Sequence, residues 1–120
     1  MRNRTLALCT LALLAAGLTL ARAEEKNGVT VYEGAKYDAE TSQFVGNAMK
    51  VDASCYRTNA TVAQVNEFYQ KQPGMTVVST SAKGGMFTKG KVTVTVQSPW
   101  LNMKTGQHNT DTLISIVKHP

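Results

Sequence analysis

The side chains with the most varied chemistry in this chain crowd into one short segment, residues 98–111. The segment carries the only tryptophan of the chain, together with a methionine, a lysine and one of the two histidines. Trp and Met are enriched at the centres of protein interfaces. The segment therefore predicts a candidate partner surface made of Trp100, Leu101, Met103, Lys104 and His108.

The same segment also has the pattern of a turn between two strands. Asn102 to Gln107 resembles a hairpin connection in which a type I turn is followed by glycine, and Gly106 would supply the positive φ. Pro99 cannot donate to a β-ladder, so it indicates a sheet edge or a bulge. We favour the interpretation that Trp100 folds back on the sheet with its indole N–H at the wet rim, over an exposed Trp100 at a binding tip.

No nucleophile, base and acid can be assembled into a catalytic set from this sequence. His108 and His119 are the only imidazoles, and neither has a serine or an aspartate at a suitable spacing. The sequence also contains no phosphate-binding loop, dinucleotide fingerprint, EF-hand loop or His-Glu-x-x-His zinc motif. We therefore predict no catalytic residues, no cofactor and no enzymatic activity, with a small enzyme of unrecognised site as an alternative.

Soft metal ligands are present but dispersed. They comprise the two histidines, Cys55, Met49, Met75, Met86 and Met103. Thioethers, thiolates and imidazoles bind copper, which exported bacterial proteins handle. Because no Met-x-Met or His-x-x-Met cluster is present, we expect Met49 and Met86 to fill the core. We predict no metal site and keep periplasmic copper handling as an alternative.

The first 23 residues have the pattern of a bacterial export signal. Arg2 and Arg4 precede an apolar run from Leu6 to Leu20, and Ala21-Arg22-Ala23 is a small-x-small cleavage pattern. The apolar run is shorter than the roughly 20 residues that a membrane-spanning helix needs. We predict cleavage after Ala23, a periplasmic or secreted location, and a single mature domain of residues 24–120 without a membrane span.

Cleavage after Ala23 changes both the charge and the cysteine content. Three arginines leave with the signal, so 13 basic residues become 10 against 8 acidic ones, and the formal charge falls from +5 to +2. That small excess gives no reason to expect a nucleic-acid partner. Cys55 is the one cysteine left, so no internal disulfide can form, and its place on an apolar strand face predicts a buried thiol.

One helix and several strands are expected to position these residues. A capping box of Thr61 and Gln64 begins a helix that Pro73-Gly74 must end, and residues 33–47 have the least regular pattern. We predict an α+β fold in two layers, with one main helix (about 61–72) packed on an antiparallel sheet of four to six strands. Alternating or β-branched runs predict strands at residues 29–32, 49–56, 76–79, 86–88, 91–97 and 112–118.

Short motifs along the mature chain resemble a diffuse group of small exported bacterial domains of unknown function. They are Val31-Tyr32-Glu33-Gly34-Ala35, a capped helix that ends in Phe68-Tyr69, the segment Gly74 to Val78, and the hairpins from Phe87 to Val96. Met75 departs from the pattern, in which an aromatic residue is more familiar after the glycine. The resemblance implies an exported α+β domain and brings no catalytic or ligand-binding residues with it.

These observations together favour a binding function. We predict a non-enzymatic binding or interaction module of the cell envelope, whose partner is an unknown protein or another envelope component. An exposed edge strand could pair with a second copy, so we expect a monomer or an edge-strand dimer. An inhibitor of a cell-envelope hydrolase is the alternative within binding, because it needs only a rigid loop that enters an active site.

Overall fold

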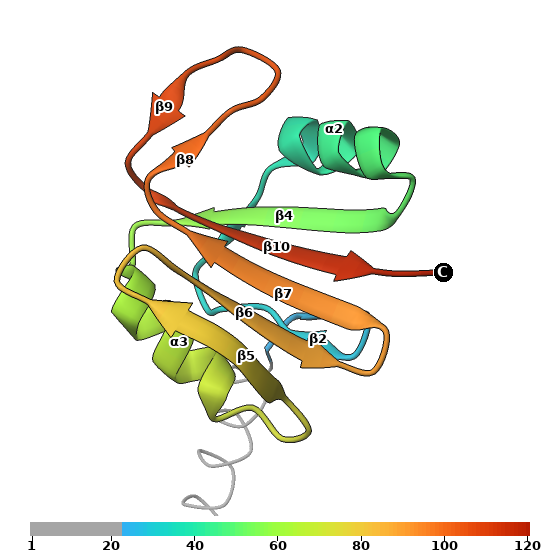
Figure 1. The fold of residues 1–120 in the computed structure, drawn as a ribbon, viewed down its shortest axis with the longest axis vertical. Helices are drawn as coiled ribbons and strands as arrows, with labels where there is room; N and C mark the ends of the chain where they lie inside the picture. The colour runs from blue at the N-terminus through green and yellow to red at the C-terminus, as the bar shows by residue number, and fades with distance from the viewer. Residues whose placement is uncertain (1–22) are drawn as a thin grey trace, which may run out of the picture.

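A computed structural model describes residues 23–120 of the chain, so the predicted signal segment, apart from Ala23, lies outside the described residues. The main sheet is antiparallel throughout, with its strands in the order β3-β4-β10-β7-β6-β5 (Figure 1). Its strands are β3 (Lys36–Tyr37), β4 (Asp52–Thr58), β5 (Thr76–Ser81), β6 (Gly84–Lys89), β7 (Val92–Gln97) and β10 (Thr112–Lys118).

Helix α3 (Val62–Gln70) packs on one face of this sheet and encloses the main core. Its predicted capping box is present, because the Gln64 amide donates to Thr61 Oγ1 at 3.2 Å and the Thr61 amide donates to Gln64 Oε1 at 2.9 Å. The two-layer α+β fold is confirmed, with six strands in the sheet. Buried side chains of this core include Tyr56, Val65, Tyr69, Phe87, Val94, Val96, Ile114 and Ile116.

A short N-terminal hairpin completes this core without joining the main sheet. Strands β1 (Glu25–Lys26) and β2 (Val29–Thr30) pair only with each other, so the predicted strand at residues 29–32 is not an edge of the main sheet. Val29 and Val31 are nevertheless buried against α3. The Tyr69 hydroxyl donates to the carbonyl of Thr30 at 3.0 Å, which fixes the hairpin to the helix.

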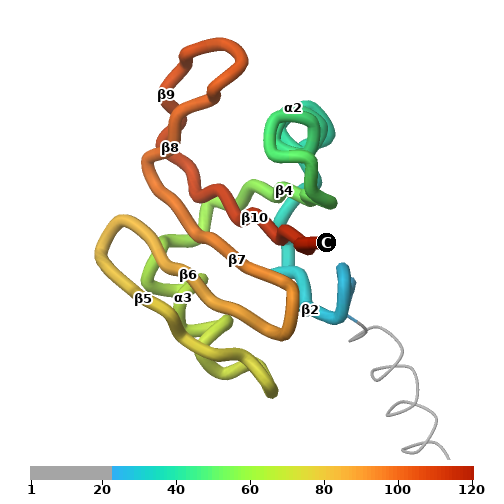
Figure 2. The backbone as a smooth tube through the Cα atoms, turned by 45° about the vertical axis from the view of Figure 1, so that its right-hand side comes forward, coloured from blue at the N-terminus to red at the C-terminus, as the bar shows by residue number. Residues whose placement is uncertain are grey.

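A second helix, α2 (Ala39–Met49), stands where the sequence predicted an irregular stretch, so that prediction was wrong. Asp38 caps it, with Oδ1 accepting the Thr41 amide at 3.0 Å, and Lys50 ends it in the left-handed region at φ 56°. Val45 packs with Cys55 and other residues on the sheet face opposite α3. The helix therefore lies over β4 and leaves much of that second face open (Figure 2).

The strand predicted at residues 49–56 was wrong at its start, because α2 extends to Met49. Met49 belongs to α2 and is 59% exposed, and β4 begins only at Asp52. Ser54, Cys55 and Tyr56 are all buried, because one face of β4 joins the main core and α2 covers the other. The expectation that Met49 and Met86 fill the core was wrong, since Met86 is 39% exposed.

The predicted hairpin is confirmed between β8 (Trp100–Leu101) and β9 (His108–Asn109). Gly106 has the expected positive φ of 78°, and its amide donates to the carbonyl of Asn102 at 2.7 Å. Figures 1 and 2 show the hairpin projecting beyond the main sheet on the same side as α2. Among residues 23–120, none of the helices is both long enough and apolar enough to cross a membrane.

Candidate functional site

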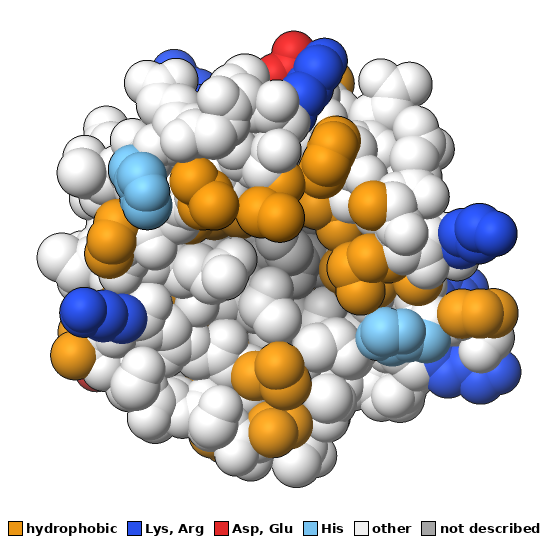
Figure 3. All heavy atoms as spheres, turned by 45° about the horizontal axis from the view of Figure 1, so that its top comes forward, with side chains coloured by type: hydrophobic (Ala, Val, Ile, Leu, Met, Phe, Trp, Pro, Cys, Tyr) orange, Lys and Arg blue, Asp and Glu red, His pale blue; other side chains and the backbone are white. Residues whose placement is uncertain are grey.

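A groove of about 600 Å³ lies between α2 and the β8–β9 hairpin, on the sheet face that α3 does not cover. Figure 3 shows hydrophobic side chains gathered around a hollow whose floor has other side-chain types. The two walls come from elements that the chain places far apart in sequence. Lining residues include Phe44, Met49, Met86, Thr93, Thr95, Gln97, Leu101, Met103, Ser115 and His119.

The walls of the groove carry large apolar side chains that the fold leaves in solvent. Phe44 from α2 is 37% exposed, and Leu101 and Met103 from the hairpin are 43% and 69% exposed. Single exposed apolar side chains are ordinary, but a contiguous group that faces a hollow is typical of an interaction site. These walls are therefore the part of the described surface best suited to bind an apolar partner.

The floor is polar because strand β7 alternates. Val92, Val94 and Val96 point into the α3-side core, so the residues between them face the groove. Thr93, Thr95 and Gln97 thus present two hydroxyls and an amide at every second residue. Ser115 of β10 and Met86 of β6 flank Thr95 in register.

Trp100 forms the base of the hairpin wall instead of an exposed tip. It is 3% exposed and packs with Cys55 and Leu113, with Val45 of α2 beside them, as a second small core. Its indole N–H donates to Asp111 Oδ1 at 2.9 Å. The interpretation that Trp100 folds back on the sheet is therefore confirmed.

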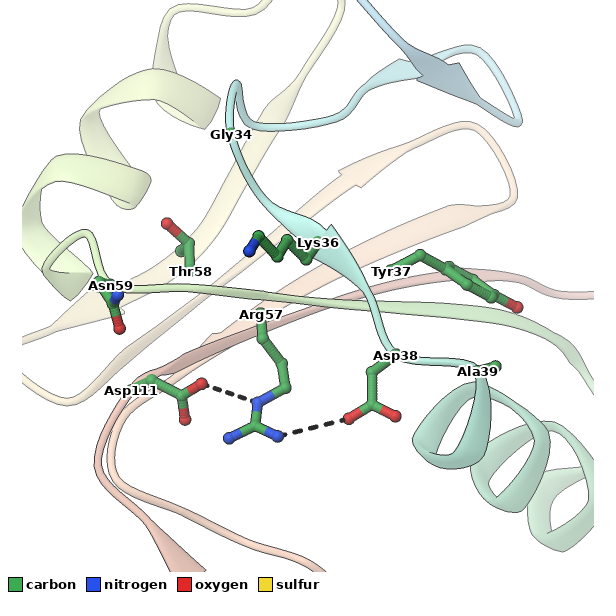
Figure 4. Close-up of a pocket in the computed structure, with 9 residues that line it drawn as sticks. All are labelled: Gly34, Lys36, Tyr37, Asp38, Ala39, Arg57, Thr58, Asn59 and Asp111. Atoms are coloured by element: carbon green, nitrogen blue, oxygen red, sulfur yellow. Dashed lines mark hydrogen bonds and ion pairs between the residues drawn. The ribbon is translucent and has the colours of Figure 1, made fainter.

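Arg57 contacts residues at the base of both walls of the groove, Asp111 after the hairpin and Asp38 before α2 (Figure 4). Its Nε donates to Asp111 Oδ2 at 2.7 Å, and its Nη1 lies 3.9 Å from Oδ2 of Asp38, the residue that caps α2. Its guanidinium carbon lies 5.1 Å from the centre of the Trp100 ring. A second, polar depression is lined by Arg57, Asp38 and Asp111. Both carboxylates already pair with Arg57, so we assign them a structural role in holding the hairpin and α2 in place.

The Asp111 carboxyl and the Arg57 guanidinium each stabilise the charged form of the other. Burial pushes the pKa of the Asp111 carboxyl upward, but hydrogen bonds from Arg57 and Trp100 and the guanidinium charge hold that pKa below its ordinary value. The hydrogen bond to Asp111 raises the pKa of Arg57 in turn. Asp111 therefore stays an acceptor for both neighbours at neutral pH.

Cys55 lies beneath the groove and not in it. It is fully buried, and its Sγ lies 3.5 Å from Ser115 Oγ, consistent with the predicted buried thiol. Burial raises the pKa of the Cys55 thiol, which disfavours the nucleophilic thiolate. Within residues 23–120, no three His, Cys, Asp or Glu side chains are grouped so that they could hold a metal ion.

The structure brings four residues of the predicted partner surface to the groove, namely Trp100, Leu101, Met103 and Lys104. His108 pairs with Leu101 in the hairpin and is not part of the groove lining. Lys104 Nζ lies 3.4 Å from Glu40 Oε2, an ion pair that joins the hairpin tip to α2.

Sequence reasoning missed the α2 wall because it missed the helix itself. It also left His119 out of the predicted partner surface, although His119 follows β10 and lines the groove. The polar floor did leave a signal, since Thr93, Thr95 and Gln97 alternate with valines in the sequence. The predicted two-layer fold, with one helix on one face of the sheet, also implied an uncovered face on which these residues lie.

No known family model matches the chain, and neither a curated protein nor a solved structure is detectably similar to it.

Proposed function

We propose that this protein is an exported, non-enzymatic binding module of the bacterial cell envelope, and that its groove takes an extended apolar segment of a partner protein. The observation that carries the proposal is the pair of apolar walls, from α2 and the β8–β9 hairpin, that face each other across a polar floor. The proposed export rests on the signal pattern of residues 1–23.

The spacing of the floor favours an extended peptide as the occupant. Thr93, Thr95 and Gln97 lie on one face of β7, so neighbouring members are separated by about 7 Å along the strand. An extended peptide repeats its backbone groups over the same two-residue distance. Hydroxyl and amide side chains both donate and accept, so this row can bond alternate backbone groups of a bound segment.

The composition of the walls favours apolar, uncharged side chains on that segment. Met49 and Met103 have flexible thioether side chains that adapt to different apolar shapes. The ion pair of Lys104 with Glu40 leaves little unbalanced charge at the hairpin end. A volume of about 600 Å³ also lies in the range of known ligand sites, about 300–1,000 Å³.

Selection of peptides from a displayed random library tests this proposal with a defined probe. The immobilised protein is the mature chain from Glu24, and selected peptides are then measured against Met103→Glu and, as a matched control, Val78→Glu. Both positions carry exposed apolar side chains, at 69% and 54%, but Val78 lies in β5 and does not line the groove. Circular dichroism verifies that each variant is folded.

We expect the selected peptides to be rich in apolar residues and to bind Met103→Glu at least tenfold more weakly than the parent protein. Binding to Val78→Glu should stay within twofold of the parent. Failure to enrich any sequence, or equal binding to both variants, would contradict a groove that binds apolar segments.

An inhibitor of a cell-envelope hydrolase is the second candidate. The observation that favours it is the projecting hairpin, whose tip carries the most exposed of the large hydrophobic side chains, Met103. A rigid tip of this kind can enter the active-site cleft of an enzyme. Assays of peptidoglycan hydrolysis with and without the mature protein test this role, and an unchanged rate across a panel of muramidases and amidases would contradict it.

A further inference from the structure

Three soft metal ligands that are scattered in the sequence line the same groove. They are Met49 on α2, Met86 on β6 and His119, the residue that follows β10. Met75 instead packs against the α3-side core, and His108 does not line the groove. We propose that Met49, Met86 and His119 together bind one Cu(I) ion.

The register of the sheet places Met86 and His119 beside the same two threonines. Met86 pairs with Thr95, and His119 Nε2 lies 3.2 Å from Oγ1 of Thr93, the neighbouring residue on that face of β7. The His119 amide also donates to the carbonyl of Lys91 at 2.9 Å, which fixes its backbone. The imidazole therefore lies beside Thr93, and Met86 lies beside Thr95, the next residue on the same face of β7.

Met49, the last residue of α2, lines the groove from the helix wall. Lys50 follows it and lines another depression together with His119, so the end of the helix and the histidine are neighbours. Met49 and Met86 are 59% and 39% exposed, so core packing does not hold their thioethers. Unbranched side chains with three rotatable bonds can converge on an ion beside the histidine.

The chemistry of this ligand set selects a soft monovalent ion. Thioether sulfur favours Cu(I), imidazole also binds copper, and none of the three groups is anionic. When His119 donates its Nε2–H to Thr93, its Nδ1 lone pair is free for the metal, and the threonine acts as the outer-shell partner that orients the ring. This inference does not depend on peptide binding, because Cu(I) binding is measured without a peptide and none of the three ligands lies on the hairpin.

Anaerobic titration of the mature chain with Cu(I), in competition with bathocuproine disulfonate, tests the site. The test variants are Met49→Leu and Met86→Leu, which keep a similar volume, and His119→Asn, which removes the imidazole. The matched controls are Met103→Leu, on the hairpin wall of the groove, and His108→Asn, outside it. Cys55→Ser is included because a thiol is the strongest competing ligand, although it is buried.

We expect one Cu(I) per chain, at least tenfold weaker binding in each test variant, and less than twofold change in the two controls and in Cys55→Ser. Far-ultraviolet circular dichroism shows whether each variant keeps its fold. The proposal is overturned if the parent protein takes no Cu(I) from the chelator. It is equally overturned if the controls or Cys55→Ser lose as much affinity as the test variants.

Discussion

The guanidinium of Arg57 lies over the ring of Trp100, and both side chains donate to one carboxylate, that of Asp111. Arg57 belongs to β4, Trp100 begins the hairpin and Asp111 follows it, so this contact joins the sheet to one wall of the groove. Asp38, at the start of the other wall, also lies within 3.9 Å of Arg57. The groove is therefore shaped by polar contacts beneath it, although its walls are apolar.

Replacement of Asp111 by Ala should weaken this support. The change leaves the indole N–H of Trp100 and the Nε of Arg57 without their acceptor, in a partly buried place. A lost partner of this kind costs about 1–3 kcal/mol, so we expect the free energy of unfolding to fall by about 2 kcal/mol. Urea unfolding, followed by the fluorescence of Trp100, measures the change.

Asp52→Ala is the matched control for that experiment. Asp52 is the first residue of β4, as Asp111 directly precedes β10, but Asp52 is exposed, and its carboxylate accepts a 3.4 Å bond from the Asn27 side chain. Surface substitutions of this kind usually change stability by less than about 0.5 kcal/mol. Equal effects of the two variants would show that Asp111 has no special role in the hairpin.

The features that the sequence predicted well are those with strong local signals. Thr61 and Gln64 form a capping box, and Gly106 takes the positive φ that its turn requires. The strand at residues 112–118 also has the predicted bounds. In each case, the residues that determine the structure are neighbours in the chain, so their pattern can be read without tertiary contacts.

Helix α2 was missed because its local signals conflict. It contains Ser42, Gly46 and Asn47, which have low helix propensity, and only a few apolar residues. Ser42 is buried, where its Oγ accepts the amide of Cys55 at 2.7 Å and also donates to the Asp38 carbonyl. Contacts between helix and strand, which the sequence does not display, stabilise this segment and hence one wall of the site.

Alkaline pH should unfold the protein partly through Tyr56. Burial, followed by the nearby charge of Glu24, raises the pKa of Tyr56 to about 12, above the value near 10 of an exposed tyrosine. A raised pKa means that the stabilisation is complete below about pH 10 and is lost as the pH rises toward about 12. Thermal unfolding between pH 9 and pH 12 should therefore show a falling Tm.

Tyr56→Phe separates this effect from general alkaline unfolding. Lysine deprotonation is common to both proteins, as is Tyr69, whose pKa burial also raises. We expect Tm to fall less steeply above pH 10 in the variant, because phenylalanine has no proton to lose. Parallel curves for the two proteins would contradict a stabilising neutral Tyr56.

The thiol of Cys55 should be inert in the folded protein. It is fully buried beneath Val45, Trp100 and Leu113, and burial raises its pKa. We expect a disulfide reagent such as dithiobis-nitrobenzoate to label the mature chain at least 100-fold faster in denaturant than in buffer, as both access and thiolate fraction increase. Rapid labelling of the native protein would show that α2 opens readily from the sheet.

Gly106→Ala should distort the hairpin wall selectively, and Gly34→Ala provides a control with the same backbone strain. The two glycines have φ values of 78° and 83°, and an added Cβ at either one would meet no atom within 4 Å. Each alanine is therefore expected to lower the free energy of unfolding by about 1 kcal/mol, because a residue with a Cβ is strained at a positive φ. Only Gly106 lies in the turn that carries Met103 and Lys104 to the groove.

Peptides selected against the parent protein should bind Gly106→Ala several-fold more weakly and should bind Gly34→Ala with unchanged affinity. Equal affinities for both variants, measured by fluorescence polarisation, would argue that the hairpin does not shape the binding surface.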